Sequence, residues 1–417
     1  MAILIKNIKA LVQVAGHGHS FVAGTDMAKL GIIPDAYLFI EKGKISLFGK
    51  MEELSEELKR ASSGWIQVID AKERMVFPCW CDPHTHLVFP ASRELEYTDK
   101  IRGLSYEEIA KRGGGILNSA GKMREISENA LFRAARERLD EIISFGTGAV
   151  EIKSGYGLTT ENELKMLRVI RRLKKTSPLT IKATFLGAHA VPMAYKSDPS
   201  AYVDLIINEM IPMVAAEELA DYIDVFCDRG FFSVEDTDRI LNAGLKYGLR
   251  PKIHANELGR TGGVQVGVKY NALSVDHLEH MGEEEIEALR GTETMPTVLP
   301  GASFFLGIPF APVRQMIDAG LPVAMASDFN PGSSPSGNMQ LILSMGCIIY
   351  RMLPEEAINA ITLNSAYAMG VEEELGSITV GKTANVFITK PIPSIEFMPY
   401  AYGSNKVETV VLNGRIV

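Results

Sequence analysis

The chain has 417 residues, 46% of them hydrophobic and 23% charged, with a formal net charge of −8, which suits a folded protein with a large core and argues against nucleic-acid or membrane partners. Its four cysteines provide no disulfide framework, and no apolar run is long enough to cross a bilayer. The first residues lack the apolar stretch of a signal peptide, so we expect a cytoplasmic protein.

Both ends of the chain are typical of short strands separated by turns. Near the N-terminus, AYLFIEKGKISLFGK contains a turn at residues 42–44, and WIQVID follows it. Near the C-terminus, GSITVGKTANVFITK precedes ETVVLNGRIV, in which the Asn413-Gly414 pair predicts a hairpin turn. Neither end alone supplies a complete sheet. We therefore predict one small β-sandwich domain formed jointly by residues 1–72 and 371–417.

Residues 73–370 alternate between apolar, β-branched runs and helical periodicity. The strand candidates are residues 75–82, 147–152, 181–187, 222–227, 250–255, 272–276, 294–299 and 321–327. Apolar residues at helical spacing mark ISENALFRAARERLDEIISFG and TENELKMLRVIRRLKK, and the sequences that start at Thr160 and Ser233 are typical of helix N-caps. Eight strand–helix repeats over about 250 residues predict an α/β fold, a (β/α)8 TIM-like barrel.

Polar residues cluster where these strands end, which is where such barrels carry their functional side chains. Five of the eight histidines occupy these ends: His84, His86, His189, His254 and His277. Glu257 follows the fifth strand and Asp328 the eighth. Three histidines and one carboxylate suit a single zinc or iron ion. Such an ion lowers the pKa of bound water to roughly 7, which favours hydrolytic chemistry.

The order of these ligands along the barrel resembles the amidohydrolase superfamily. Within it, the chain resembles the imidazolonepropionase family, which opens the imidazolone ring in histidine degradation. The matching stretches are DPHTHLVFPASRELEY, LSYEEIAKRGGGI, VEIKSGYGL, TFLGAHAVP, IDVFCDRGFFS, KIHANELG, LSVDHLEH and MASDFNPGSSPSGNMQLIL. They run through nearly the whole barrel, and KSGYGL, GGGI and SDFNPGSSP together are specific to the family.

The resemblance implies a role for each matching residue. One divalent or ferric ion, zinc or iron, would be bound by His84, His86, His254 and Asp328. The imidazolone-propanoate would be held by Arg93, Tyr156, His189, Glu257 and Ser333, and the formimino-glutamate product by Tyr156, Asn330 and Gly332. Tyr106 is a further candidate contact for the propionate. The resemblance also suggests a homodimer.

The residue types fit these implied roles. Arg93 presents a planar fork suited to a carboxylate, and Glu257 can accept a hydrogen bond from a ring N–H. His277, Asp328 and Glu257 are candidates for carrying a proton from water to the leaving ring nitrogen. His189 is an alternative group for polarising the ring carbonyl, and the sequence does not assign the two histidines to these roles.

Three other sites have competing interpretations. Lys153 could be a carbamylated bridge between two metals, but a single compact ligand set favours one metal and a structural lysine. Strand alternation places Cys79 and Cys81 on the face opposite His84 and His86, so we expect them to be small buried side chains. His17 and His19 repeat the H-x-H spacing without partner ligands, which predicts a loop without metal.

Two rival functions follow from the same residues. The first is another amidohydrolase, such as a nucleobase deaminase or a formimino-glutamate deiminase. Arg93 and SDFNPGSSP argue against a deaminase, because an uncharged base needs no group that binds a carboxylate. The second is a non-catalytic, amidohydrolase-like assembly protein, which would be expected to lose metal ligands that this chain retains.

Overall fold

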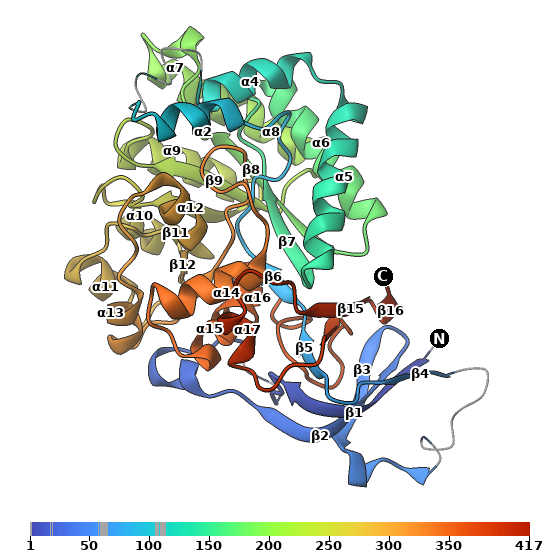
Figure 1. Cartoon of the computed structure of the whole chain (residues 1–417). Coiled ribbons are helices and arrows are strands. Elements are labelled where there is room, and N and C mark those ends of the chain that lie inside the picture. The colour runs from blue at the N-terminus through green and yellow to red at the C-terminus, as the bar shows by residue number, and fades with distance from the viewer. Residues whose placement is uncertain are drawn as a thin grey trace.

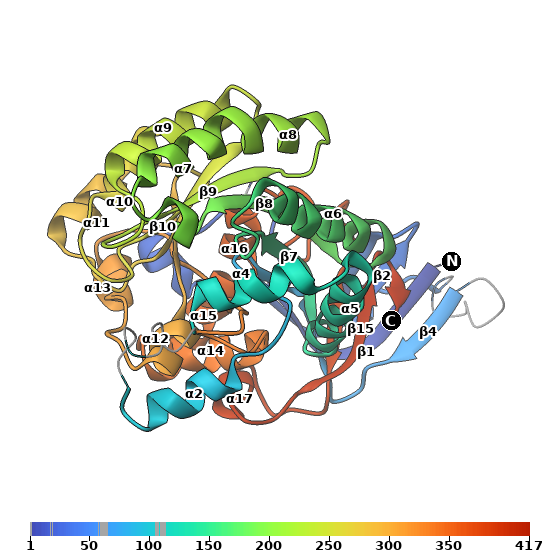
Figure 2. The same ribbon diagram turned by 90° about the horizontal axis from the view of Figure 1, so that it is seen from above.

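The computed structural model describes residues 2–16, 18, 20–56, 58, 66–104, 108 and 114–417. Within these residues the strands form two sheets of eight. One sheet is built from both ends of the chain, and the other from the region between them (Figure 1). The N- and C-termini lie on the same side of the molecule in both views (Figures 1 and 2). The predicted architecture, a parallel barrel with a second sheet from both termini, is confirmed.

The terminal sheet joins the two ends of the chain through strand pairing. Its strands are β1 (Ala2–Val12), β2 (Ile32–Glu41), β3 (Lys44–Lys50), β4 (Ile66–Asp70), β5 (Met75–Pro78), β14 (Val386–Thr389), β15 (Val407–Leu412) and β16 (Arg415–Ile416). β1 pairs antiparallel with β2 and parallel with β4 and β5, and β14 pairs antiparallel with β5. The predicted hairpin turn falls at Asn413-Gly414, where both residues have positive φ.

The second sheet is a barrel of parallel strands. These are β6 (Trp80–Asp82), β7 (Thr147–Lys153), β8 (Thr180–Ala188), β9 (Tyr222–Cys227), β10 (Arg250–Ala255), β11 (Ser274–His277), β12 (Met295–Val298) and β13 (Ala324–Met325). A parallel bridge between Thr85 and Phe329 connects the segments that follow β6 and β13. There Asp328 N donates to His84 O at 3.0 Å, and His86 N donates to Phe329 O at 2.9 Å. Barrel closure thus brings the H-x-H segment beside Asp328.

One predicted strand, residues 75–82, is two strands in different sheets. β5 ends at Pro78, which has no N–H to continue a ladder, and Cys79 N still donates to Asn385 O of the terminal sheet at 2.9 Å. Trp80 N then donates to Gly146 O at 2.9 Å, at the edge of the barrel. The apolar run was continuous because both segments are buried, so periodicity alone did not reveal the change of sheet.

Helices cover the outside of the barrel, with α5, α6, α8 and α9 outside β7 to β9 (Figure 2). They are α2 (Glu94–Ile101), α4 (Ile116–Glu125), α5 (Glu128–Ser144), α6 (Thr160–Thr176), α7 (Pro199–Leu205), α8 (Ile211–Ala216), α9 (Val234–Leu245), α10 (Gly263–Lys269), α11 (Glu283–Leu289), α12 (Pro300–Leu306), α13 (Val313–Asp318), α14 (Met339–Ile348), α15 (Pro354–Ile361), α16 (Leu363–Ala368) and α17 (Phe397–Tyr400). No helix among the described residues has the length and apolar character needed to cross a membrane.

The two predicted helix starts differ in outcome. Ser233 caps α9, and its hydroxyl and the Asp236 carboxylate form the expected reciprocal capping box. At α6 the cap is Thr159, one residue before the predicted Thr160, since the Thr159 hydroxyl accepts from Asn162 N. The Thr160 hydroxyl instead donates to Glu209, so its side chain is used in a contact between helices.

Candidate metal centre and active site

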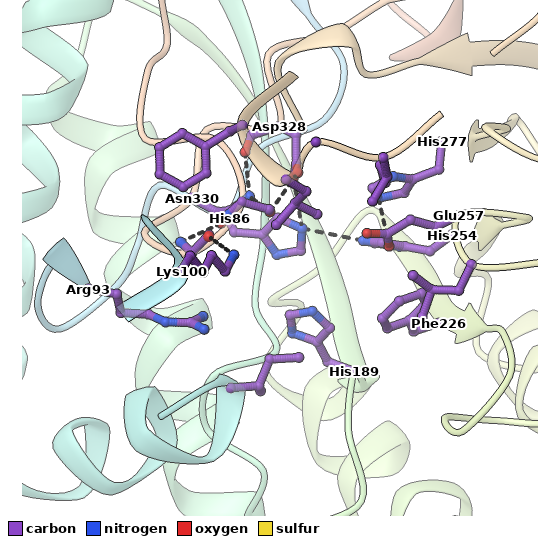
Figure 3. A pocket seen from close by; sticks show the side chains of 18 of the residues that line it. His86, Arg93, Lys100, His189, Phe226, His254, Glu257, His277, Asp328 and Asn330 are labelled. Carbon is purple, nitrogen blue, oxygen red and sulfur yellow. Dashed lines mark hydrogen bonds and ion pairs between the residues drawn. The ribbon is translucent and has the colours of Figure 1, made fainter. Parts of the chain in front are cut away.

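The carboxyl ends of the barrel strands open into a cavity of about 930 Å³ (Figure 3). Of the side chains singled out in the sequence, it is lined by His86, Arg93, Tyr156, His189, His254, Glu257, His277, Asp328, Asn330, Gly332 and Ser333. His84 does not reach the cavity surface and is completely buried. The cavity thus gathers groups from strands that are far apart in the sequence.

Three histidines converge beneath the cavity. The Nε2 atom of His86 lies 3.3 Å from Nε2 of His84 and 3.3 Å from Nε2 of His254. His84 and His86 follow β6, and His254 lies in β10 across the barrel. All three rings are buried, so their nitrogens have little access to bulk water. This is the compact nitrogen set expected of metal ligands.

Buried carboxylates lie at the Nδ1 atoms of two of these rings, on the side away from the three Nε2 atoms. Asp276 Oδ2 lies 2.7 Å from His84 Nδ1, and Asp224 Oδ2 lies 2.9 Å from His254 Nδ1. A carboxylate at Nδ1 fixes the proton on that nitrogen and leaves Nε2 with a lone pair. Burial lowers the pKa of His84 well below its usual range and that of His254 to about 4, so both rings are neutral. Neutral imidazole is the form that binds a metal.

Asp328 completes the donor set from the other side of the barrel closure. Its Oδ1 atom lies 3.6 Å from Nε2 of both His84 and His86. Its backbone has φ +53°, a left-handed conformation that is unfavourable for a residue other than glycine. Such an outlier at a strand end indicates that the surrounding structure fixes the direction of the carboxylate.

These observations fit a metal ion. Lone pairs of neutral nitrogens that face one another at 3.3 Å repel unless a cation lies between them, and a carboxylate oxygen adjoins the group. The His84, His86 and His254 nitrogens and Asp328 Oδ1 would hold such an ion. Three imidazoles and one carboxylate are a donor set that zinc and iron both accept.

The loop that follows Asp328 is organised by Asn330. Asn330 Oδ1 accepts from the N–H groups of Gly332 and Ser333, both at 2.8 Å. Asn330 Nδ2 donates to Asp328 O at 2.6 Å, and the Ser333 hydroxyl donates to Asp328 Oδ2 at 3.2 Å. The sequence placed Asn330, Gly332 and Ser333 as substrate contacts, and they line the cavity. The side chain of Asn330 also holds the shape of this loop.

One imidazole and two carboxylates lie close together on the β10–β11 side of the cavity. His277 Nε2 is 3.6 Å from Glu257 Oε2, and its Nδ1 is 3.5 Å from Glu279 Oε1. Burial alone would lower the pKa of His277, but the two carboxylates outweigh it and raise the pKa to about 10. Burial raises the pKa of Glu257 to about 7 and that of Asp328 to about 6. His277 is therefore a protonated group, unlike the metal-facing rings.

His189 lies over the histidine cluster as a neutral ring. It stacks on His86 with ring centroids 5.1 Å apart, and its Nδ1 lies 2.9 Å from Gly155 O. Because a carbonyl can only accept, Nδ1 carries the proton and Nε2 is an acceptor. Burial lowers the pKa of His189 to about 3, so the ring stays neutral. In this state it can accept an N–H from a ligand and has no second N–H with which to polarise a carbonyl.

Arg93 faces the cavity from the start of α2. Its Nε and Nη2 atoms lie 2.8 and 2.7 Å from Glu96 Oε2. Glu96 in turn accepts from Gly115 N at 3.0 Å and Asn118 Nδ2 at 3.1 Å, so this carboxylate is fixed. The Arg93 guanidinium lies directly over Gly332, where a Cβ would require it to move.

Similarity to known proteins identifies the family. An imidazolonepropionase from Flavobacterium johnsoniae is 56% identical over 417 residues, and one from Christiangramia forsetii is 54% identical over 417 residues. Both alignments cover all of this chain and all of the relative. The chain belongs to the imidazolonepropionase family. The broader amidohydrolase family description matches residues 115–417. An atrazine chlorohydrolase from Arthrobacter aurescens TC1, solved in complex with zinc, shares the fold with a TM-score of 0.70, 16% identity and coverage of 99% of this chain and 94% of its own.

A network of buried charges lies next to the cluster of His84, His86 and His254. Lys153 Nζ is 2.7 Å from Glu151 Oε1, 2.8 Å from Asp224 Oδ2 and 3.6 Å from Asp276 Oδ2. Lys252 Nζ contacts Glu151 and donates to Pro83 O at 2.9 Å. With two close carboxylates at its ammonium, Lys153 supports the structural interpretation over the carbamylated bridge, and one metal per chain stays our prediction.

The cysteines near the H-x-H motif are inert. Cys79 and Cys81 are buried, as predicted, and burial raises the pKa of the Cys81 thiol to about 12. Burial also raises the pKa of the Cys227 thiol. None of these three thiols is therefore poised to act as a nucleophile.

The sequence interpretation missed the orienting groups. It assigned no role to Asp276 or Asp224, and none to Lys100, which lines the cavity. A usable signal was present, because Glu151, Asp224 and Lys252 are charged residues within strands and each has an apolar residue on both sides. Tyr106, His17 and His19 lie outside the described residues.

The position of Asp224 predicts a measurable effect on metal affinity. Asp224→Asn removes the carboxylate that fixes the His254 proton, so we expect a metal dissociation constant about 10- to 100-fold higher. Competition with a chromophoric chelator on the folded variant measures this constant. An unchanged constant would show that Asp224 serves only the charge balance with Lys153.

Proposed function

We propose that this chain hydrolyses the ring of 4-imidazolone-5-propanoate to N-formimidoyl-L-glutamate, with one zinc or iron ion per chain at His84, His86, His254 and Asp328. The observation that carries the proposal is that Arg93 lines the same cavity as three members of this metal-type donor set, and that the fourth, His84, lies buried against His86. Family membership supports the same reaction.

The substrate has two ends, and the cavity offers a different chemistry to each. Its propanoate suits Arg93, whose planar guanidinium donates to carboxylates. Its ring has N–H groups, for which the neutral His189 Nε2 and the Glu257 carboxylate are acceptors. Tyr156 and Ser333 line the same cavity. We propose this arrangement as the binding mode.

Hydrolysis adds water across the bond between the ring carbonyl carbon and its nitrogen. A metal ion bound at the donor set would lower the pKa of water and polarise a carbonyl. The carbon gains the oxygen, the C–N bond breaks, and the nitrogen takes up a proton. Asp328 Oδ1 lies 3.6 Å from Nε2 of both His84 and His86, beside the proposed ion, and this position supports it as the group that removes the proton from water. The protonated His277, with Glu257 beside it, supports delivery of a proton to the leaving nitrogen.

A direct assay tests the proposed function. Metal-loaded protein is given freshly prepared imidazolone-propanoate, and loss of ring absorbance is followed together with mass spectrometry for a product heavier by one water. Elemental analysis of the same sample distinguishes zinc from iron. Turnover supports the proposal. Absence of turnover in protein that holds its metal would favour the deaminase or deiminase alternatives.

Arg93→Ala should separate substrate binding from metal binding. Loss of one charge-assisted contact predicts a KM roughly 10- to 100-fold higher with unchanged metal content. Because the variant also leaves Glu96 without its cation, Arg93→Ala combined with Glu96→Gln is the matched control for stability. Metal loss in parallel with the rise in KM would mean that Arg93 is a structural residue.

A further inference from the structure

Lys100 is the second cation on the same face of α2 as Arg93. Seven residues separate the two positions, which is close to two helical turns. Both side chains line the cavity and reach into it from the same side, whereas Glu257 and His277 lie on the opposite side (Figure 3). Lys100 Nζ lies 3.5 Å from Gly332 O, and the Arg93 guanidinium passes over the same glycine. The two cations therefore converge on Gly332.

The charges of Arg93 and Lys100 are compensated differently. Arg93 uses two of its nitrogens on Glu96, so this pair is formally neutral. Lys100 has no ion pair with any described residue; its contacts are the Gly332 carbonyl and the ring of Phe305, 5.8 Å away. Burial, followed by the nearby charge of Arg93, lowers the pKa of Lys100, and the carboxylates of Glu96 and Glu257 oppose this shift without forming an ion pair with it. The net positive charge at this end of the cavity thus comes from Lys100.

A half-buried ammonium that forms no ion pair with any described residue is stabilised when an anion approaches it. Lys100 Nζ is directed toward Gly332 O and the ring of Phe305, and both residues line the cavity, so an anion that enters the cavity can reach this ammonium. Tyr97 stacks on Phe305 with ring centroids 5.0 Å apart and supports this position. The site is therefore prepared for a carboxylate.

We propose that Lys100 binds the substrate carboxylate together with Arg93, and that it selects ligands carrying a carboxylate over neutral ones. This inference rests on the proposed function for the identity of the substrate. The binding step itself requires only a ring that carries a propanoate. Arg93 contributes directional hydrogen bonds, but its charge is balanced by Glu96. Lys100 therefore contributes the positive charge that attracts the carboxylate.

The test compares charge and shape at position 100. Lys100→Met keeps the length and removes the charge, and Lys100→Arg keeps the charge. KM and kcat are measured for imidazolone-propanoate and for its neutral carboxamide. We expect Lys100→Met to raise KM for the carboxylate roughly 10- to 100-fold, with kcat changed less than about threefold. Lys100→Arg should recover most of the loss, and KM for the carboxamide should change less than about twofold.

A control variant and a binding measurement complete the design. Arg229→Met removes an exposed cation elsewhere on the cavity lining, so it reports the effect of overall charge. Equal losses in Arg229→Met and Lys100→Met, or equal losses for the carboxylate and the carboxamide, would overturn the proposal.

Calorimetric binding of imidazole-4-propanoate, whose ring is not hydrolysed, gives a readout without turnover. If this ligand loses affinity in Lys100→Met but the wild type shows no ring opening, the proposed function fails and the role of Lys100 stands. Turnover without any effect at Lys100 would leave the proposed function standing and overturn the role of Lys100.

Discussion

His254→Ala will strongly weaken both metal binding and ring opening while leaving the barrel folded. The Nε2 atom of His254 lies 3.3 Å from His86 Nε2, and removal of the ring leaves two imidazoles and one carboxylate, which bind an ion weakly. Mutation of a residue that only orients a metal ligand typically lowers metal affinity or activity by about 10- to 100-fold. Loss of a ligand itself should therefore lower kcat/KM by more than about a thousandfold.

The measurement is metal content per chain, taken alongside kcat/KM and the circular dichroism spectrum. His280→Ala is the matched control, because His280 lies three residues after His277, is half-buried and stands apart from the cluster. We expect this control to keep its metal and its activity. A fully metal-loaded but inactive His254→Ala would move His254 from the ligand set to the proton-transfer machinery. An active variant would remove the site from the reaction altogether.

The strand pattern predicted the barrel well because each strand is buried on both sides and is therefore an apolar run. The predicted ends of β9 and β10 coincide with the observed ones, and polar residues at or near these ends reach the cavity. The pattern failed at residues 75–82, where a change of sheet leaves no trace in hydrophobicity. Pro78 was the one local signal of a break.

The candidate site was predictable to the extent that strand ends identify it. His84, His86, His254 and Asp328 meet because barrel closure and strand pairing bring their strands together. The residues that orient the candidate metal ligands were not predictable in the same way. Whether Asp224 orients His254 or only neutralises Lys153 depends on distances across three strands, which no single-strand pattern contains. The same holds for Lys100, whose lack of an ion pair with any described residue depends on its surroundings.

Removal of a charge from the buried network around Lys153 is expected to lower the stability of the protein strongly. Glu151, Asp224 and Asp276 supply three carboxylates, and Lys153 and Lys252 supply two ammonium groups, all of them completely or almost completely buried. The formal charge of this group is −1, and Lys153→Met makes it −2. An uncompensated buried charge costs about 3–5 kcal/mol, so we expect the free energy of unfolding to fall by about this amount.

Urea denaturation of Lys153→Met, with and without Glu151→Gln, tests this account. The double variant removes one carboxylate and returns the formal charge to −1, so it should recover a large part of the lost stability. Two ions per wild-type chain, with one lost in Lys153→Met, would instead reveal a carbamylated lysine that bridges two metals. One ion per chain in the wild type, with a double variant more stable than the single variant, would establish Lys153 as the cation that compensates the carboxylates behind His84 and His254.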